Sequence, residues 1–221
     1  MKIREIAETK RKAKEWFASY TADYDMEDPK IALKAVHTYH VAELCQTIAE
    51  SLALNEVECM AAWLSGLLHD VGRFEQIRRF NTFSDADSID HALLSTEILF
   101  GTKEDASCGR IRQVILDPSW DIYLYKAIKY HSAYRLPPDL SEMEKTYCQI
   151  LRDADKIDIF RVNLETPMED IYNTTTETLK QAEVTSEVLQ AFKERHAVLR
   201  ALKKTPVDNV VGHISLYYEL V

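Results

Sequence analysis

Residues 57–70 read VECMAAWLSGLLHD, and this stretch is apolar on nearly every side when it is drawn as a helix. Such a helix belongs in the interior of a protein, because a surface helix keeps one polar face. The stretch ends in His69 and Asp70, polar side chains that are costly to bury without a compensating partner. It therefore predicts a central buried helix that carries polar groups at its C-terminal end.

The rest of the chain also favours helices. Glycine is scarce, at 5 of 221 residues, which leaves few tight turns and few strand boundaries. Residues 71–90 are expected to form a loop with short helical pieces, and Pro137 and Pro138 exclude a helix around them. No run of alternating apolar and polar residues indicates strands, so the predicted fold is all-α. Further helices are expected over residues 3–19, 29–53, 89–100, 105–116, 121–131 and 141–160, with two or three more in residues 167–221.

Charge and composition exclude several classes of protein. The net charge is −9, and an excess of Asp and Glu is poorly suited to non-specific binding of nucleic acid or of an anionic membrane. No stretch of about 18 apolar residues predicts a transmembrane helix, and the charged N-terminal segment lacks an apolar signal-peptide core. We therefore expect a cytoplasmic protein. Its cysteines are far apart, which argues against a disulfide framework or a thiolate zinc site.

Six ligand-type side chains fall on or beside the apolar stripes of the predicted helices. They are His37, His69, Asp70, His91, His131 and Asp155. One histidine on an apolar face is usually structural, but so many polar groups in one small helical core are costly to desolvate. A divalent cation compensates for this cost. Imidazole and carboxylate ligands suit Fe, Mn, Ni, Co, Zn or Mg, with Mg the least natural partner for several histidines.

Three short motifs give this pattern a family resemblance. Residues 37–45 read HTYHVAELC, residues 67–74 read LLHDVGRF, and residues 152–158 read RDADKID. In this order they resemble the HD superfamily of metal-dependent phosphohydrolases over about residues 30–160. The resemblance implies an orthogonal bundle of five or more helices around a metal site.

The same resemblance implies a domain organisation and a set of ligands. The metal-binding helical domain is assigned to residues 1–165, with residues 166–221 as a C-terminal helical extension packed on it. Matched residue by residue, one metal ion would be held by His37, His69, Asp70 and Asp155. In members with additional histidines a second ion is bound, which here implies His91 and His131 as its ligands and Asp70 as the bridge. One or two divalent ions per chain are therefore expected.

Two ligand assignments stay open. His40 lies one turn from His37 on the same predicted helix, and His37 is preferred because Val41 follows it at the family spacing. Asp153 and Asp158 compete with Asp155. Asp158 lies nearer the centre of its apolar stripe, so we expect it to orient a ligand rather than to bind metal. Two further expectations are structural. Trp63 and Tyr147 belong to the core, and the acidic patch of Asp85, Asp87 and Asp90, which could bind a cation, is expected to be a solvated loop.

Basic residues near the motifs are candidates for binding a phosphate group. Arg73 and Lys156 directly follow the metal motifs, and Arg78 and Arg79 lie close by. Arginine matches phosphate oxygens in a bidentate manner. Asp70 is also a candidate to accept a proton from the attacking water. We therefore expect a metal-dependent phosphohydrolase that acts on a nucleotide or another small phosphorylated metabolite.

Two other functions fit the same residues. Some members of the HD superfamily with six ligands resemble mixed-valent di-iron oxygenases, which use O₂ in place of water. A nucleotide- or metal-sensing module that keeps the ligands without turnover is the non-enzymatic alternative. The sequence leaves the substrate, the metal and the oligomeric state open.

Overall fold

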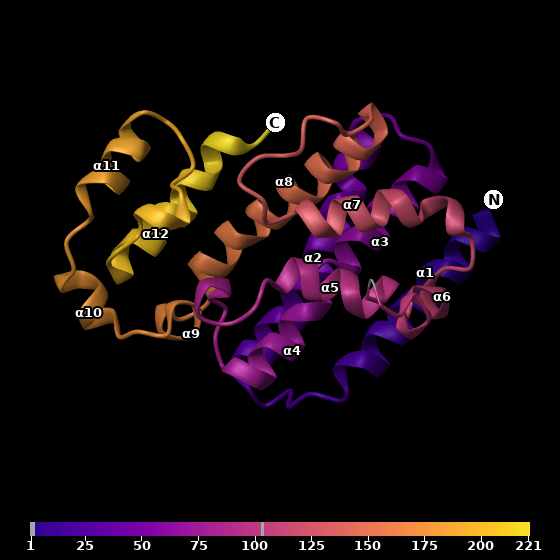
Figure 1. Ribbon diagram of the computed structural model, residues 1–221, viewed down its shortest axis with the longest axis horizontal. Helices are drawn as coiled ribbons and strands as arrows, with labels where there is room; N and C mark the ends of the chain where they lie inside the picture. Colours follow the sequence, from indigo (N-terminus) through magenta and orange to yellow (C-terminus); the bar gives the residue numbers. More distant parts are fainter. Residues whose placement is uncertain (1–2, 103) are drawn as a thin grey trace. The chain divides into compact units, whose positions relative to one another are not determined.

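The computed structural model describes residues 3–102 and 104–221, and the regular secondary structure within these ranges is entirely helical. This confirms the predicted all-α fold. The chain divides into two compact units, residues 1–154 and residues 155–221, and the division falls inside one long helix, α8 (Glu142–Glu165) (Figure 1).

The first unit carries the longer helices. Apart from the start of α8, its α-helices are α1 (Ile3–Thr21), α2 (Pro29–Ser51), α3 (Glu56–Leu68), α4 (Val71–Phe80), α5 (His91–Phe100), α6 (Ile111–Val114) and α7 (Asp121–Tyr130). Single 3₁₀ turns connect some of them, at Asp85–Asp87, Ala106–Cys108 and Pro118–Trp120. No helix among the described residues is long and apolar enough to cross a membrane.

Helix α3 is the central buried helix that the sequence predicts. Every residue from Cys59 to Leu68 is buried. A Cβ placed on Gly66 would lie 2.6 Å from Ala42 Cα, so a glycine is needed where α2 crosses α3 at this distance. Trp63 on α3 and Tyr147 on α8 are both fully buried, which confirms their assignment to the core.

Residues 71–80 differ from the prediction, because they form the regular helix α4 rather than a loop with helical pieces. Val71, Phe74 and Ile77 are buried at helical spacing, and ion pairs between one glutamate and two arginines support the last turns. Asn81 ends the helix in the left-handed conformation, with φ 51°. Polar side chains on the exposed face had concealed the apolar stripe. This helix matters for the site because it begins directly after Asp70.

The predicted helix over residues 105–116 is also different, since only Ile111–Val114 is α-helical. Gly109 comes so close to the end of α5 that a Cβ on it would lie 2.5 Å from Phe100 C. A continuous helix through this point would place side chains in that contact. The loop around the two prolines is present as predicted, and Ser141 and Glu144 form the predicted capping contacts before α8.

The second unit follows α8 with short helices. They are α9 (Met168–Tyr172), α10 (Thr176–Gln181), α11 (Ser186–Lys193) and α12 (Pro206–Ser215), with 3₁₀ turns at Arg200–Leu202 and Leu216–Glu219. Asp208 is fully buried and accepts hydrogen bonds from the backbone N–H groups of Thr185, Lys204 and Thr205. Although burial raises the pKa of Asp208, a hydrogen bond from the Thr185 hydroxyl and these backbone hydrogen bonds lower it to about 2. One charged carboxylate thus ties together the segments that flank α11 and α12.

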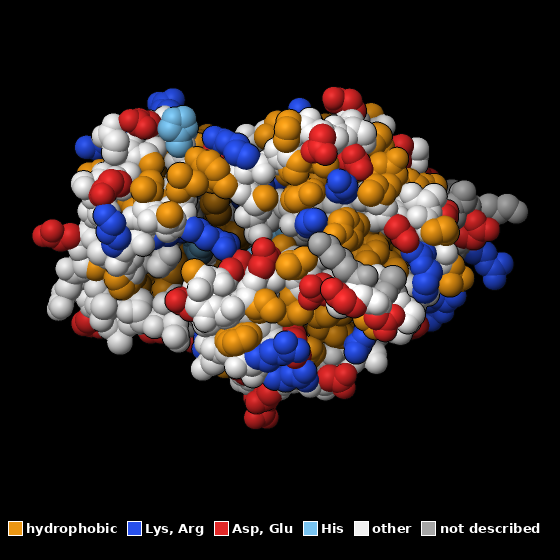
Figure 2. Space-filling model, viewed as in Figure 1, with side chains coloured by type: hydrophobic (Ala, Val, Ile, Leu, Met, Phe, Trp, Pro, Cys, Tyr) orange, Lys and Arg blue, Asp and Glu red, His pale blue; other side chains and the backbone are white. Residues whose placement is uncertain are grey.

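Charged side chains of both signs are distributed over the surface. On the face drawn in Figure 2, Lys and Arg side chains are interspersed with Asp and Glu.

Candidate metal centre

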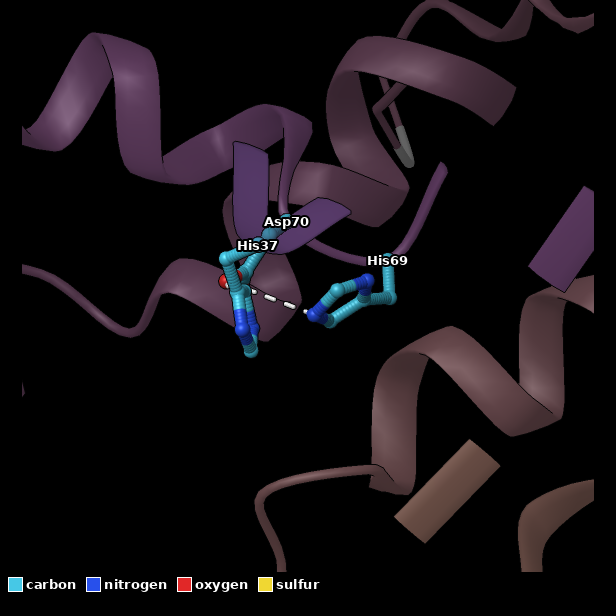
Figure 3. A group of neighbouring side chains, drawn as sticks. All are labelled: His37, His69 and Asp70. Carbon is cyan, nitrogen blue, oxygen red and sulfur yellow. Dashed lines mark ion pairs between the residues drawn. The ribbon is translucent and has the colours of Figure 1, made fainter. Parts of the chain in front are cut away.

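The first group of ligand-type side chains joins α2 to the end of α3. His37 comes from α2, His69 directly follows α3, and Asp70 lies at the junction with α4 (Figure 3). Asp70 Oδ2 lies 3.8 Å from His37 Nε2 and 3.3 Å from His69 Nε2, and none of the three side chains is more than 2% exposed. We refer to His37, His69 and Asp70 as the first triplet.

The second group uses the other oxygen of the same carboxylate. Asp70 Oδ1 lies 3.6 Å from Nε2 of His91, the first residue of α5, and 3.6 Å from Nε2 of His131, which directly follows α7. The two Nε2 atoms are 2.9 Å apart, and both imidazoles are buried. We refer to Asp70, His91 and His131 as the second triplet. In each triplet the three candidate ligand atoms lie within 4.8 Å of one another.

Helix ends fix the orientation of two of these imidazoles. His69 Nδ1 lies 2.7 Å from Gly66 O, and His131 Nδ1 lies 2.7 Å from Ile128 O. Each carbonyl belongs to the last turn of a helix, where it has no partner inside the helix. A carbonyl oxygen only accepts hydrogen bonds, so the proton of each neutral ring is on Nδ1. The lone pair on Nε2 then faces Asp70.

A carboxylate fixes the third imidazole. His91 Nδ1 lies 2.8 Å from both oxygens of Asp85, which also places its ring proton on Nδ1. Burial lowers the pKa of His91, and the positive charge of Arg73 lowers it further, to about 3. The ring is therefore neutral near pH 7, and its Nε2 is available as a ligand atom.

The second triplet fits a metal ion by its geometry and its donor atoms. Two neutral imidazoles with their Nε2 lone pairs 2.9 Å apart repel each other unless a cation lies between them. These two nitrogens and Asp70 Oδ1 form a triangle, and the point in its plane that is equally far from all three atoms lies about 2.0 Å from each. This is the length of a metal–nitrogen or metal–oxygen bond. Nitrogen and carboxylate donors without thiolate suit Fe, Mn, Co, Ni or Zn.

Asp70 is charged in this surrounding. Burial raises the pKa of its carboxyl, but the electrostatic interactions with His69 and Lys34 lower it by more, so that the pKa lies well below its usual range. Lys34 Nζ is 2.7 Å from Asp70 Oδ2, and its side chain is 16% exposed. Lys34 was not among the site residues predicted from the sequence. Its spacing is the missed signal, because Lys34 lies one turn before His37 and so on the same face of α2.

Arg73 lies beside the second triplet, and one nitrogen of its guanidinium, Nη1, is occupied. Its Nη1 lies 2.6 Å from Gln76 Oε1, 2.7 Å from Phe83 O and 2.9 Å from Asp85 Oδ1. Its Nε points towards Asp70 Oδ1 at 3.8 Å, which is beyond hydrogen-bond distance. The predicted phosphate-binding arginine is thus close to the ligands and is buried, with 10% of its side chain exposed.

The other predicted phosphate-binding residues are engaged elsewhere. Arg78 and Arg79 have exposed side chains at the end of α4, and both pair with Glu75. Lys156 belongs to the second unit, where its Nζ donates a hydrogen bond to Glu219 O at 2.8 Å. Their roles in binding phosphate stay predictions.

The structure brings together five of the six predicted metal ligands. Asp155 is the first residue of the second unit and is half-buried on α8, so its role as a ligand stays a prediction. Of its competitors, Asp153 is buried in the first unit, and Asp158 accepts hydrogen bonds from Arg161 at 2.6 and 2.9 Å. His40 is exposed, whereas His37 is buried, as the preference for His37 requires.

The acidic patch corrects one expectation. Asp87 and Asp90 are exposed, as a solvated loop requires, but Asp85 turns inward and only 10% of its side chain is exposed. It contacts His91 and Arg73. No helical periodicity extends through this turn, so the sequence pattern offered no signal that separated Asp85 from its neighbours.

Comparisons with known proteins add one finding to this geometry. The profile of the family described as HD domain matches residues 35–160, which is more than half of the chain and includes both triplets and Asp155. Searches of curated proteins and of solved structures found no match.

Proposed function

This chain belongs to the HD domain family, a superfamily of metal-dependent hydrolases, and we propose that it cleaves the phosphate ester of a nucleotide or of another small phosphorylated metabolite. One observation carries the proposal. The buried carboxylate of Asp70 directs one oxygen towards the imidazoles of His37 and His69 and the other towards those of His91 and His131. A carboxylate shared in this way suits two divalent cations on either side of it.

In this proposal the ligands divide between two ions. His37 and His69 would hold the first, and His91 and His131 would hold the second. Asp70 bridges them. Bound divalent cations supply Lewis acidity, which lowers the pKa of a water molecule to about 7 and makes it a nucleophile at neutral pH. The strongly lowered pKa of Asp70 supports its function as a bridging ligand, because the carboxylate stays ionised.

Lys34 is the proposed contact of the phosphate group. Lys34 lies at the edge of the first triplet, and its partial exposure leaves the ammonium within reach of a ligand that enters from solvent. Its charge is placed to stabilise negative charge on the non-bridging oxygens in the transition state. The acidic net charge of −9 supports a small phosphorylated substrate over a nucleic acid.

The test is phosphate release by metal-stripped protein that has been reloaded with one metal at a time in the absence of oxygen. The hydrolase proposal predicts that Mn²⁺, Co²⁺ or Ni²⁺ each supports release of inorganic phosphate from at least one member of a panel of nucleotides and sugar phosphates. Lys34→Glu should lower kcat/KM strongly while metal remains bound. Half-buried Lys30, one turn earlier on α2, provides the matched control, Lys30→Glu.

A mixed-valent di-iron oxygenase is the second candidate. The observation in its favour is the presence of four imidazoles around one carboxylate, a set rich enough in nitrogen to suit iron. The same experiment distinguishes the two functions. An oxygenase requires iron and O₂ and releases no phosphate, so strictly oxygen-dependent consumption of a substrate would reject the hydrolase proposal and retain the metal ligands.

A further inference from the structure

The turn that precedes α5 holds a carboxylate against a proposed metal ligand. Asp85 lies in the 3₁₀ turn Asp85–Asp87 and directs both oxygens at His91 Nδ1, at 2.8 Å each. We propose that Asp85 is a positioning residue that sets the affinity of the second triplet for its metal ion, and that Arg73 supports Asp85 through its Nη1 atom. This inference rests on the metal centre of the proposed function.

The partner of Nδ1 distinguishes His91 from two of the other imidazoles. His69 and His131 each face a backbone carbonyl, which is neutral and held by a helix. His91 faces a charged carboxylate. A carboxylate on the far nitrogen of a ligating imidazole fixes the ring orientation and makes the near nitrogen a stronger donor. The second triplet therefore depends on a side chain in a turn, which substitution can remove without changing a helix.

Asp85 is itself held in place from α4. Its Oδ1 accepts hydrogen bonds from Arg73 Nη1 at 2.9 Å and from Gln76 Nε2 at 3.0 Å. Gln76 Nε2 also lies 2.9 Å from Ser88 Oγ and 3.0 Å from Ile89 O, so it fixes both ends of the turn. Arg73 and Gln76 lie one turn apart on the helix that starts directly after Asp70. The same helix thus positions the bridging carboxylate and the group that orients His91.

The contacts of Arg73 show why it is assigned to this turn. Nη1 carries two hydrogens and already has three oxygen acceptors, those of Gln76, Phe83 and Asp85. A guanidinium that binds phosphate in a bidentate manner needs two nitrogens directed at the ligand. Nη1 is therefore committed to the support of Asp85, whereas Nε has no hydrogen-bond partner among the described residues.

The experiment measures metal binding rather than turnover. Full-length, metal-stripped protein is titrated with Co²⁺ and followed by calorimetry and by visible absorption, for wild type, Asp85→Ala, Asp85→Asn and Arg73→Gln. Exposed Asp87, at the end of the same 3₁₀ turn, provides the matched control, Asp87→Ala. Two binding steps are expected in the wild type. Asp85→Ala and Arg73→Gln should each lower the Co²⁺ affinity of one binding step by about 10–100-fold and leave the other step unchanged. Asp87→Ala should change the affinity of neither step.

Asp85→Asn keeps an oxygen that accepts from Nδ1 and should give an intermediate loss, with a change in the absorption of the second Co²⁺. It also serves as the test protein if Asp85→Ala fails to fold. The inference would be overturned if the wild type bound a single ion, or if the Asp85 and Arg73 variants bound two ions with the same affinities as Asp87→Ala. An Arg73→Gln protein with normal Co²⁺ binding but a raised KM would return Arg73 to phosphate binding. If two ions bind as described and no phosphate ester is cleaved, the proposed function fails and this inference stands.

Discussion

The two triplets share one carboxylate but are built in different ways. In the first, His37 lies within the long helix α2 and His69 is held by a carbonyl of the central helix α3. In the second, His91 begins a helix and depends on the carboxylate of Asp85 in the preceding turn. Each triplet also contains one histidine at a helix end whose Nδ1 faces the carbonyl three residues earlier, His69 in the first and His131 in the second.

The ligands of the first triplet are therefore positioned by the packing of the core, whereas His91 in the second is positioned by a turn. Displacing the ligands of the first triplet requires a shift of α2 against α3, which form the buried centre of the unit. Displacing His91 requires only a change in the turn before α5. A second difference is electrostatic, because Lys34 places an ammonium 2.7 Å from the oxygen of Asp70 that faces the first triplet.

The largest expected effect is that of Asp70→Ala, because Asp70 belongs to both triplets. We expect both ions to be lost, which elemental analysis of the purified protein measures directly. The helical fold should persist, with a decrease of about 1–3 kcal/mol in the free energy of unfolding of the metal-free protein, because Lys34 then lacks its partner. Asp87→Ala is the control for the loss of a carboxylate at the surface. Retention of one ion would show that the triplets do not share Asp70.

Two glycines allow the triplets to be disturbed separately through the backbone. An added Cβ would meet Ala42 Cα at 2.6 Å in Gly66→Ala, and the backbone oxygen of His91 at 2.5 Å in Gly72→Ala. Each change should lower the free energy of unfolding by about 1–3 kcal/mol, as measured by urea denaturation. Metal titration should show weaker binding at the first triplet for Gly66→Ala and at the second for Gly72→Ala. Equal effects of both variants on both steps would contradict two separable positions.

Single ligand substitutions should remove one ion each. His37→Ala is expected to abolish binding at the first triplet and to leave the second, whereas His91→Ala is expected to do the reverse, because each imidazole faces a different oxygen of Asp70. The readout is the number of ions per chain by elemental analysis. His40→Ala is the matched control, since His40 is exposed one turn from His37. Loss of an ion from that control would reopen the choice between the two histidines.

The same contrast explains how far the sequence could predict the site. The first triplet could be predicted from the sequence because His69 and Asp70 are adjacent at the end of an all-apolar helix, and His37 lies on an apolar stripe. The helices that carry His91 and His131 were also predicted from periodicity. Asp85 could not be predicted, because its inward orientation depends on hydrogen bonds from α4, a helix that the sequence analysis treated as a loop with helical pieces.

Arg73 illustrates the limit for charged side chains. Its position three residues after Asp70 indicated correctly that it lies near the predicted metal ligands. Which group it contacts was set by the fold of residues 81–85, since Phe83 O and Asp85 take its hydrogen bonds. Lys34 shows the opposite case, because its spacing from His37 was visible in the sequence, and only its partner, Asp70, was not.

The smallest expected effect concerns Lys34 and applies to the first triplet alone. Lys34→Met removes the ammonium that offsets the buried charge of Asp70, so the metal-free protein should lose about 1–3 kcal/mol of stability near pH 7. Because Lys34 helps to hold the pKa of Asp70 below its unfolded value, this stabilisation is present above about pH 4 and is lost on acidification. The variant should therefore begin to unfold at a higher pH than the wild type in an acid titration followed by circular dichroism.

A bound cation near Asp70 takes over the role of the ammonium. Loading with Co²⁺ should therefore raise the melting temperature of Lys34→Met by more than that of the wild type, and the affinity at the first triplet should increase while the second is unchanged. Lys30→Met, one turn earlier on α2, controls for the loss of a lysine, since Lys30 Nζ donates to Asn81 Oδ1 and not to Asp70. An equal gain at both triplets would show that Lys34 acts on the whole centre through Asp70, and the electrostatic difference between the triplets would then be wrong.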